Sequence, residues 1–122
     1  MRPHERLDLW KRSIDFVVAI YRLTDNFPKE EKFGLTSQLR RAAVSVAANV
    51  AEGAAKTSTK DFRRYLSNSQ GSASEIETEL QIALRLNYVD EADFKILSKD
   101  LDDVGRMITG LSRSLQRREP EL

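Results

Sequence analysis

The stretch that most constrains the fold is residues 33–53, FGLTSQLRRAAVSVAANVAEG, which carries only three charged side chains and no proline. At about 100° per residue, its apolar side chains fall in one narrow row along a helix. The row consists of Leu35, Leu39, Ala42, Ala43, Val46, Val50 and Gly53. This spacing predicts a helix over residues 34–53 that packs into the core of a helical bundle, with Gly53 as its C-terminal cap.

The outward side of this helix lacks the lysines and glutamates of an ordinary solvent face. It consists of Thr36, Ser37, Arg40, Val44, Ala47, Ala48 and Ala51. A helix without a charged face is usually buried all round, and one small bundle cannot surround it. We therefore expect another subunit to cover this side in a homo-oligomer. The alternative is that this side is exposed to solvent, and that alanine is frequent there only because of its high helix propensity.

Two rows of polar residues lie beside the expected core positions, one on this helix and one on the next. They consist of Gln38, Arg41, Ser45, Asn49 and Glu52, and of Asn68, Ser72, Glu75 and Glu79. Because buried polar groups need hydrogen-bond partners, we expect the rows to meet as a network, with Arg41 paired to Glu75 or Glu79. The alternative is an active site. However, the chain has no cysteine, no Gly-rich phosphate loop and no metal-ligand spacing, and its one histidine is His4. We expect no catalysis, metal or cofactor.

Three further helices are predicted from the spacing of apolar residues, over residues 5–26, 59–87 and 91–117. Pro28 follows the first helix, and the other two begin at the capping residues Ser58 and Asp90. Short connections favour antiparallel neighbours. The sequence therefore predicts one all-α domain over residues 1–122, an up-down antiparallel four-helix bundle that assembles with copies of itself.

Composition indicates the cellular compartment of the protein more clearly than its function. The 122 residues have a net charge of +1 and no cysteine, which suits a reducing compartment. No stretch has the 18 or so apolar residues of a membrane span, and the N-terminus carries charges where a signal peptide needs an apolar run. We expect a cytoplasmic protein that does not bind membranes.

A distinctive ordered set of residues extends over most of the chain: Leu9-Trp10, Tyr21, Phe27-Pro28, FGL at 33–35, QLRRA at 38–42, Ser45, NVAEG at 49–53, Asp61-Phe62, Leu66, Gly71-Ser72 and Glu75. In these residues the sequence resembles the family of 23S ribosomal RNA intervening-sequence proteins. The resemblance implies a four-helix bundle that forms a ring, typically a homopentamer. The chain is similar also to the accessory protein of diversity-generating retroelements, a pentamer that uses a basic surface to contact nucleic acid and a reverse transcriptase.

A basic cluster lies where the second and third helices are joined. Residues 39–64 hold six basic and two acidic residues, a net charge of +4. The candidate nucleic-acid contacts are Arg40, Lys56, Lys60, Arg63 and Arg64. In a ring, each subunit would repeat this cluster on one rim, and phosphate contacts act additively, so the hypothesis is a non-enzymatic scaffold that binds RNA or DNA. The alternatives are an ordinary solvated cluster, or an adaptor that binds a nucleic-acid enzyme but no nucleic acid.

Overall fold

Four α-helices form the protein in the computed structural model, which describes residues 2–119. The helices are α1 (Asp8–Thr24), α2 (Leu35–Ala54), α3 (Thr59–Arg85) and α4 (Glu91–Gln116). Short 3-10 helices, η1 (Pro3–Arg6) and η2 (Lys29–Glu31), precede α1 and α2. No strand occurs in residues 2–119, so the predicted all-α class is confirmed. The expected domain, 1–122, also includes residues 1 and 120–122, which lie outside the described part.

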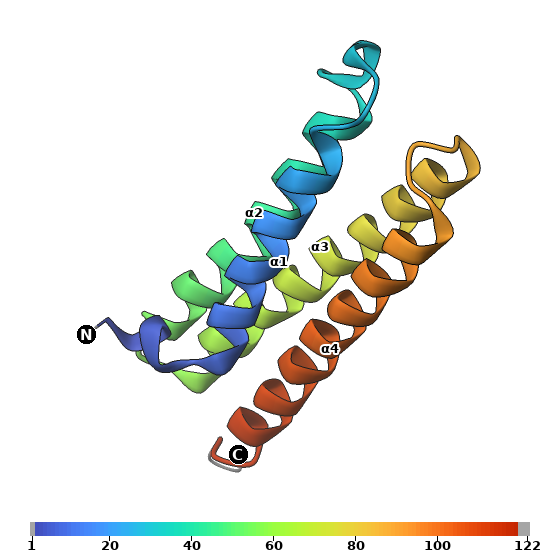
Figure 1. The fold of residues 1–122 in the computed structure, drawn as a ribbon. Helices are drawn as coiled ribbons and strands as arrows, with labels where there is room; N and C mark the ends of the chain where they lie inside the picture. Colours follow the sequence, from blue (N-terminus) through green and yellow to red (C-terminus); the bar gives the residue numbers. More distant parts are fainter. Residues whose placement is uncertain (1, 120–122) are drawn as a thin grey trace.

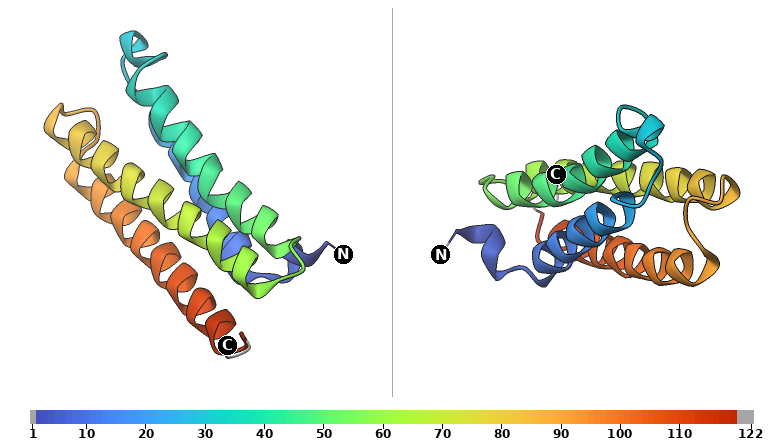
Figure 2. Two further views of the ribbon diagram at one scale, coloured as in Figure 1. Left: turned by 180° about the vertical axis from the view of Figure 1, so that it is seen from behind. Right: turned by 45° about the horizontal axis from the view of Figure 1, so that its top comes forward.

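Consecutive helices run in opposite directions, as in an up-down bundle (Figure 1). α2 contacts α1 and α3, and α4 contacts α3 and α1. The N-terminal arm, the α2–α3 link and the end of α4 lie together at one end of the bundle. At the other end, the α1–α2 pair diverges from the α3–α4 pair (Figure 2). The two ends therefore differ in which segments they expose.

The predicted core row of α2 is buried along its whole length. Leu39, Ala43 and Val50 are 0% exposed, and the other members are also buried. Apolar side chains from α1, α3 and α4 complete the core, including Ile20, Ile76 and Ile108. A buried side chain of this size contributes roughly 1.5–3 kcal/mol to folding. The core thus holds all four helices together.

The helix ends explain where the chain turns. Ser58 and Asp90 cap α3 and α4 as predicted, because their side chains accept hydrogen bonds from the backbone N–H groups three residues on. The start of α2 is capped differently: Oε1 of Glu31 accepts from the Leu35 N–H at 3.0 Å. After α3, Asn87 takes a left-handed conformation with φ 62°, which ends the helix and starts the turn to α4.

Gly53 has a different role from the predicted cap. α2 continues to Ala54, so Gly53 lies within the helix. A Cβ atom at Gly53 would lie 2.8 Å from Cδ1 of Phe62 and 2.9 Å from Cβ of Tyr65. The missing side chain therefore allows close packing of α2 against the start of α3.

The first helix and the outward side of α2 also differ from expectation. Residues 3–6 form η1, and extended backbone at Leu7 separates it from α1, so the long helix begins at Asp8 rather than at residue 5. Thr36 and Ala47 are buried inside the protomer at 8% and 5% exposure. The chain therefore covers part of the side that was expected to need another subunit.

Candidate functional site

The part of α2 that stays uncovered forms an apolar surface together with α1. Trp10, Ile14 and Val17 of α1 lie beside Val44, Ala48 and Ala51 of α2 along a shallow groove. We call these six residues the open face. Ile14 is 38% exposed and Val44 is 43% exposed, so the groove presents neighbouring apolar side chains from two helices to solvent. The open face is suited to contact with another apolar surface.

The centre of the predicted polar network is present between α2 and α3. The hydroxyl groups of Ser45 and Ser72 are hydrogen-bonded at 2.9 Å. Nδ2 of Asn49 donates to the backbone oxygen of Ser45 at 2.8 Å and to its hydroxyl at 3.1 Å. The Ser45–Ser72 bond connects the two polar rows and so α2 to α3, whereas the Asn49 bonds stay within α2. Glu52 is exposed and lies outside this group.

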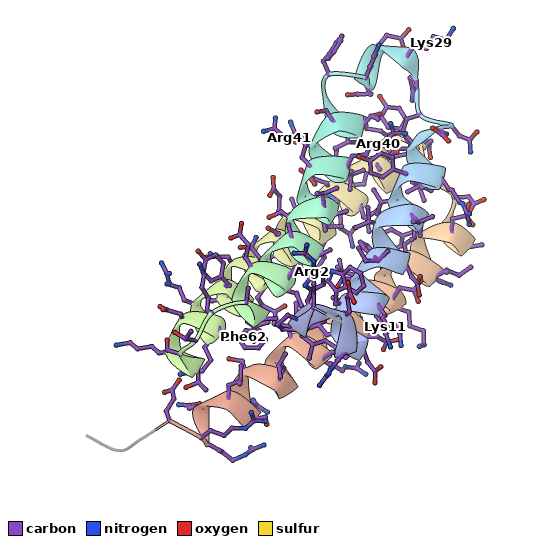
Figure 3. The ribbon with its side chains drawn as sticks, turned by 90° about the vertical axis from the view of Figure 1, so that its left-hand side faces the viewer. Arg2, Lys11, Lys29, Arg40, Arg41 and Phe62 are labelled. Atoms are coloured by element: carbon purple, nitrogen blue, oxygen red, sulfur yellow. The ribbon has the colours of Figure 1, made fainter. Side chains whose placement is uncertain are left out.

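The pairing expected for Arg41 is not made within the protomer. Arg41, Gln38 and Glu75 line a groove of about 490 Å³ between α2 and α3, which we call the α2–α3 groove. Arg41 and Glu75 are both exposed, and no ion pair joins them in the part of the chain that the structure describes. Arg41 points outward from α2 (Figure 3). The sequence thus predicted which residues share a face, but the predicted pairing of Arg41 is wrong within the protomer.

Glu79 is the one member of the polar rows that is fully enclosed. Its side chain is 4% exposed, and its Oε1 atom has no hydrogen-bond partner among residues 2–119. Burial raises the pKa of Glu79 to about 7, and the charge and hydrogen bonding of the neighbouring Glu75 carboxyl add to this rise. A buried carboxyl oxygen without a hydrogen-bond partner is costly, and the raised pKa favours the protonated carboxyl, which can donate a hydrogen bond to Glu75.

Four of the predicted basic contacts gather at the end of the bundle formed by the α2–α3 link. They are Lys56, Lys60, Arg63 and Arg64. Arg63 connects this segment to the end of α4, because its Nη1 atom lies 3.1 Å from Oε1 of Glu119. Its Nε atom also donates to the Ser112 hydroxyl at 3.4 Å.

The end of α4 adds basic residues that lie outside the predicted set of contacts. Arg113, Arg117 and Arg118 lie near the segment that Arg63 contacts. We call these three residues, with Lys56, Lys60, Arg63 and Arg64, the basic end. The signal was present in the sequence: all five acidic side chains of α4 lie within residues 91–103, whereas its arginines and those that follow it all come after residue 105. The net charge of residues 90–122, taken as one segment, does not show that the acidic and basic side chains occupy different parts of it.

Arg40 does not belong to the basic end. It lies 16 positions before Lys56, or about 24 Å along a helix. Its guanidinium donates to the Thr24 hydroxyl at 2.7 Å and contacts Asp25 at 3.0 Å. Figure 3 shows it directed between α2 and α1, where it joins the two helices.

Tyr65 is an aromatic residue in contact with two of these cations. Nζ of Lys56 lies 5.2 Å from the centre of the Tyr65 ring, and Cζ of Arg64 lies 5.1 Å from it. Both distances are within the range of cation–π interactions. The aromatic ring of Tyr65 therefore contacts basic groups. This arrangement favours contact of those groups with phosphates over stacking of the Tyr65 ring on bases.

Two further properties of residues 2–119 bear on function. No group of three or more His, Cys, Asp or Glu side chains in this range could hold a metal ion. None of its helices combines the length and the apolar character needed to cross a membrane.

Comparison with known proteins identifies the family. The model of the 23S rRNA-intervening sequence protein family matches residues 5–110. Comparison with curated proteins finds no match. A solved structure from Bacteroides thetaiotaomicron, a protein of unknown function from the S23 ribosomal protein family, is similar with a TM-score of 0.77 and 22% sequence identity. The alignment covers 85% of this chain and 97% of that one, so it shows a shared fold. Given the match over residues 5–110, this chain belongs to the 23S rRNA-intervening sequence protein family.

Proposed function

We propose that this protein is a non-enzymatic scaffold that assembles with copies of itself and contacts nucleic acid through the basic end. The observation that carries the proposal is the gathering of seven basic side chains from two distant segments at one end of the bundle. Repetition of that end around a ring of subunits would give a basic surface that one chain lacks. Phosphate contacts are additive, so affinity for a nucleic-acid backbone would rise with each copy.

Self-assembly is supported by the open face. Its six residues carry no charge, and they line a shallow groove between α1 and α2. Exposed apolar surface that is continuous across two helices is a typical feature of protein interfaces. The resemblance to ring-forming relatives gives the expected form, a homopentamer.

The test combines light scattering with size-exclusion chromatography, with and without a short RNA or DNA duplex. The expected result is a mass near five times the 13.9 kDa of one chain, and a further increase with nucleic acid that salt abolishes. A monomer at all concentrations would contradict the scaffold. An assembly that does not bind nucleic acid, but that binds a protein partner even at high salt, would instead identify an adaptor.

A further inference from the structure

A polar pocket lies between α3 and α4 at the basic end, and we call it the α3–α4 pocket. Its volume is about 300 Å³, which is at the small end of ligand pockets and suits a compact group. The polar side chains that line it are two arginines, three hydroxyls and two amides, and no acidic residue of the described range is among them. They are Arg63, Arg113, Ser67, Thr109, Ser112, Gln70 and Gln116.

Hydrogen bonds in the α3–α4 pocket leave two of its hydroxyl groups able to donate to a ligand. The Thr109 hydroxyl accepts from Nε2 of Gln70 at 3.0 Å, and the same amide donates to the Gly105 carbonyl at 3.1 Å. The Ser112 hydroxyl accepts from Nε of Arg63 at 3.4 Å. A hydroxyl that accepts a hydrogen bond still has its own proton to donate. The pocket therefore offers donors to a ligand, as an anion requires.

The two arginines make the α3–α4 pocket positive. Arg113 is exposed and makes no ion pair among residues 2–119. Arg63 already binds an anion, because its Nη1 atom lies 3.1 and 3.3 Å from the two carboxylate oxygens of Glu119. A guanidinium binds carboxylate and phosphate oxygens through the same N–H groups. The Glu119 carboxylate therefore occupies a position at which Arg63 can hold another oxyanion.

The adjoining surface between α3 and α4 does not have this positive character. A groove of about 590 Å³ continues from the α3–α4 pocket, and Glu77 and Asp102 line it together with Arg106 and Arg113. The formal charges of these four side chains cancel, so this groove has little attraction for an anion. The features that suit an anion are therefore confined to the α3–α4 pocket.

We infer that the α3–α4 pocket binds a phosphate group, which Arg113 and Arg63 hold and which displaces the Glu119 carboxylate from Arg63. The Thr109 and Ser112 hydroxyls donate to the remaining phosphate oxygens. This inference deepens the proposed function, on which it rests for the source of the phosphate, the backbone of a bound nucleic-acid strand. A contact of this kind fixes the position of the strand on the protein without reading its sequence. A free phosphorylated small molecule presents the same oxygens, and the test distinguishes the two sources.

The test uses the full chain and two probes, a labelled RNA strand without terminal phosphates and inorganic phosphate. Fluorescence anisotropy measures the affinity for RNA, and titration calorimetry measures the affinity for phosphate. Arg113→Gln should weaken binding about tenfold, and Ser112→Ala, which changes no charge, about threefold. Glu119→Gln should strengthen binding about threefold, because the carboxylate no longer competes for Arg63. Such a gain cannot result from unfolding.

Arg85→Gln and Glu91→Gln are the matched controls. They make the same two changes of charge at exposed positions, at the end of α3 and the start of α4. Both variants should bind RNA and phosphate as the wild type does, because neither residue lines the α3–α4 pocket. Thermal unfolding of every variant checks that the fold is kept.

The outcomes separate this inference from the proposed function. If RNA binds but the pocket variants behave as their controls do, or if Arg113→Gln and Arg85→Gln cause equal losses, the pocket is wrong and the proposed function stands. If inorganic phosphate binds with the expected dependence and RNA does not bind, the pocket takes a free phosphorylated molecule and the proposed contact with nucleic acid fails. The expected dependence with RNA assigns the phosphate to the strand. Failure of both probes to bind would overturn both proposals.

Discussion

Glu79 determines how the stability of the separated protomer should depend on pH. The pKa of Glu79 is raised from 4.5 to about 7, mainly because the side chain is buried. The folded protomer therefore binds the proton more tightly than the unfolded chain does, so the free energy of unfolding should fall as pH rises from 4.5 to 7. The full loss is about 3 kcal/mol.

Glu79→Gln should remove this loss, because the amide has no proton to release. We expect its unfolding free energy, measured by urea denaturation at concentrations where the protomer is monomeric, to exceed that of the wild type by about 1–3 kcal/mol at about pH 8. The two proteins should differ least near pH 4.5, the ordinary pKa of the carboxyl. Equal stability above the raised pKa would show that the Glu79 carboxyl is solvated or paired in the protomer.

Gly53 gives a second prediction at the scale of one residue. Gly53→Ala should destabilise the protein by about 1–3 kcal/mol, because its Cβ would lie within 2.9 Å of Phe62 and Tyr65 side-chain atoms and would separate α2 from α3. Gly71→Ala is the matched control: nothing lies within 4 Å of its Cβ, so helix propensity alone should raise stability by about 1 kcal/mol. Thermal unfolding of both variants checks the pair, and a stabilised Gly53→Ala would contradict the close approach.

At the scale of the helix, α2 shows what residue spacing can predict. Its buried row, its length and the caps of the next two helices all follow from local patterns. The pattern of a single helix does not say which neighbour covers a given side. Spacing alone therefore places Ala47 on the outward side, although it packs beside Ile14 and Val17 of α1. Likewise, Arg41 and Glu75 share a groove, but their pairing depends on the register between helices, which periodicity does not encode.

A charge placed on the open face should prevent assembly. Val44→Glu should place a charge on an apolar surface without filling the core, because Val44 is 43% exposed. We expect loss of assembly, measured as a fall in mass by light scattering, with little change in the helical content of the protomer. Ile96→Glu makes the same kind of change on α4, where Ile96 is 60% exposed, and should leave the mass unchanged. Equal behaviour of the two variants would exclude the open face as an interface.

The arrangement of the whole molecule creates a surface that no single segment contains. Arg63 lies 49 positions from Ser112 along the chain, yet the two side chains are hydrogen-bonded. The sequence predicted the cluster at the α2–α3 link because those residues are adjacent. It did not predict the contribution of α4, because net charge over a segment hides where the charges lie once the helix is packed.

The basic end should therefore determine how binding of nucleic acid responds to salt. Lys56→Gln combined with Lys60→Gln removes two exposed cations that take part in no ion pair among residues 2–119, so the fold should be preserved. If both lysines bind phosphates, affinity should fall, and the slope of log K against log salt should become shallower by about 0.9 for each phosphate that is no longer neutralised. Fluorescence anisotropy with a labelled duplex over a salt series measures both quantities.

Lys29→Gln combined with Lys95→Gln provides the control, because it removes the same charge from exposed positions away from the basic end. This pair should lower affinity only slightly and leave the salt slope unchanged, since a phosphate contact requires the cation to lie at the binding surface. Equal losses of affinity for the two pairs would mean that the protein attracts nucleic acid by its general charge. With a net charge of only +1, such attraction would be weak, so strong and selective sensitivity at residues 56 and 60 is the result that identifies the basic end as the contact surface.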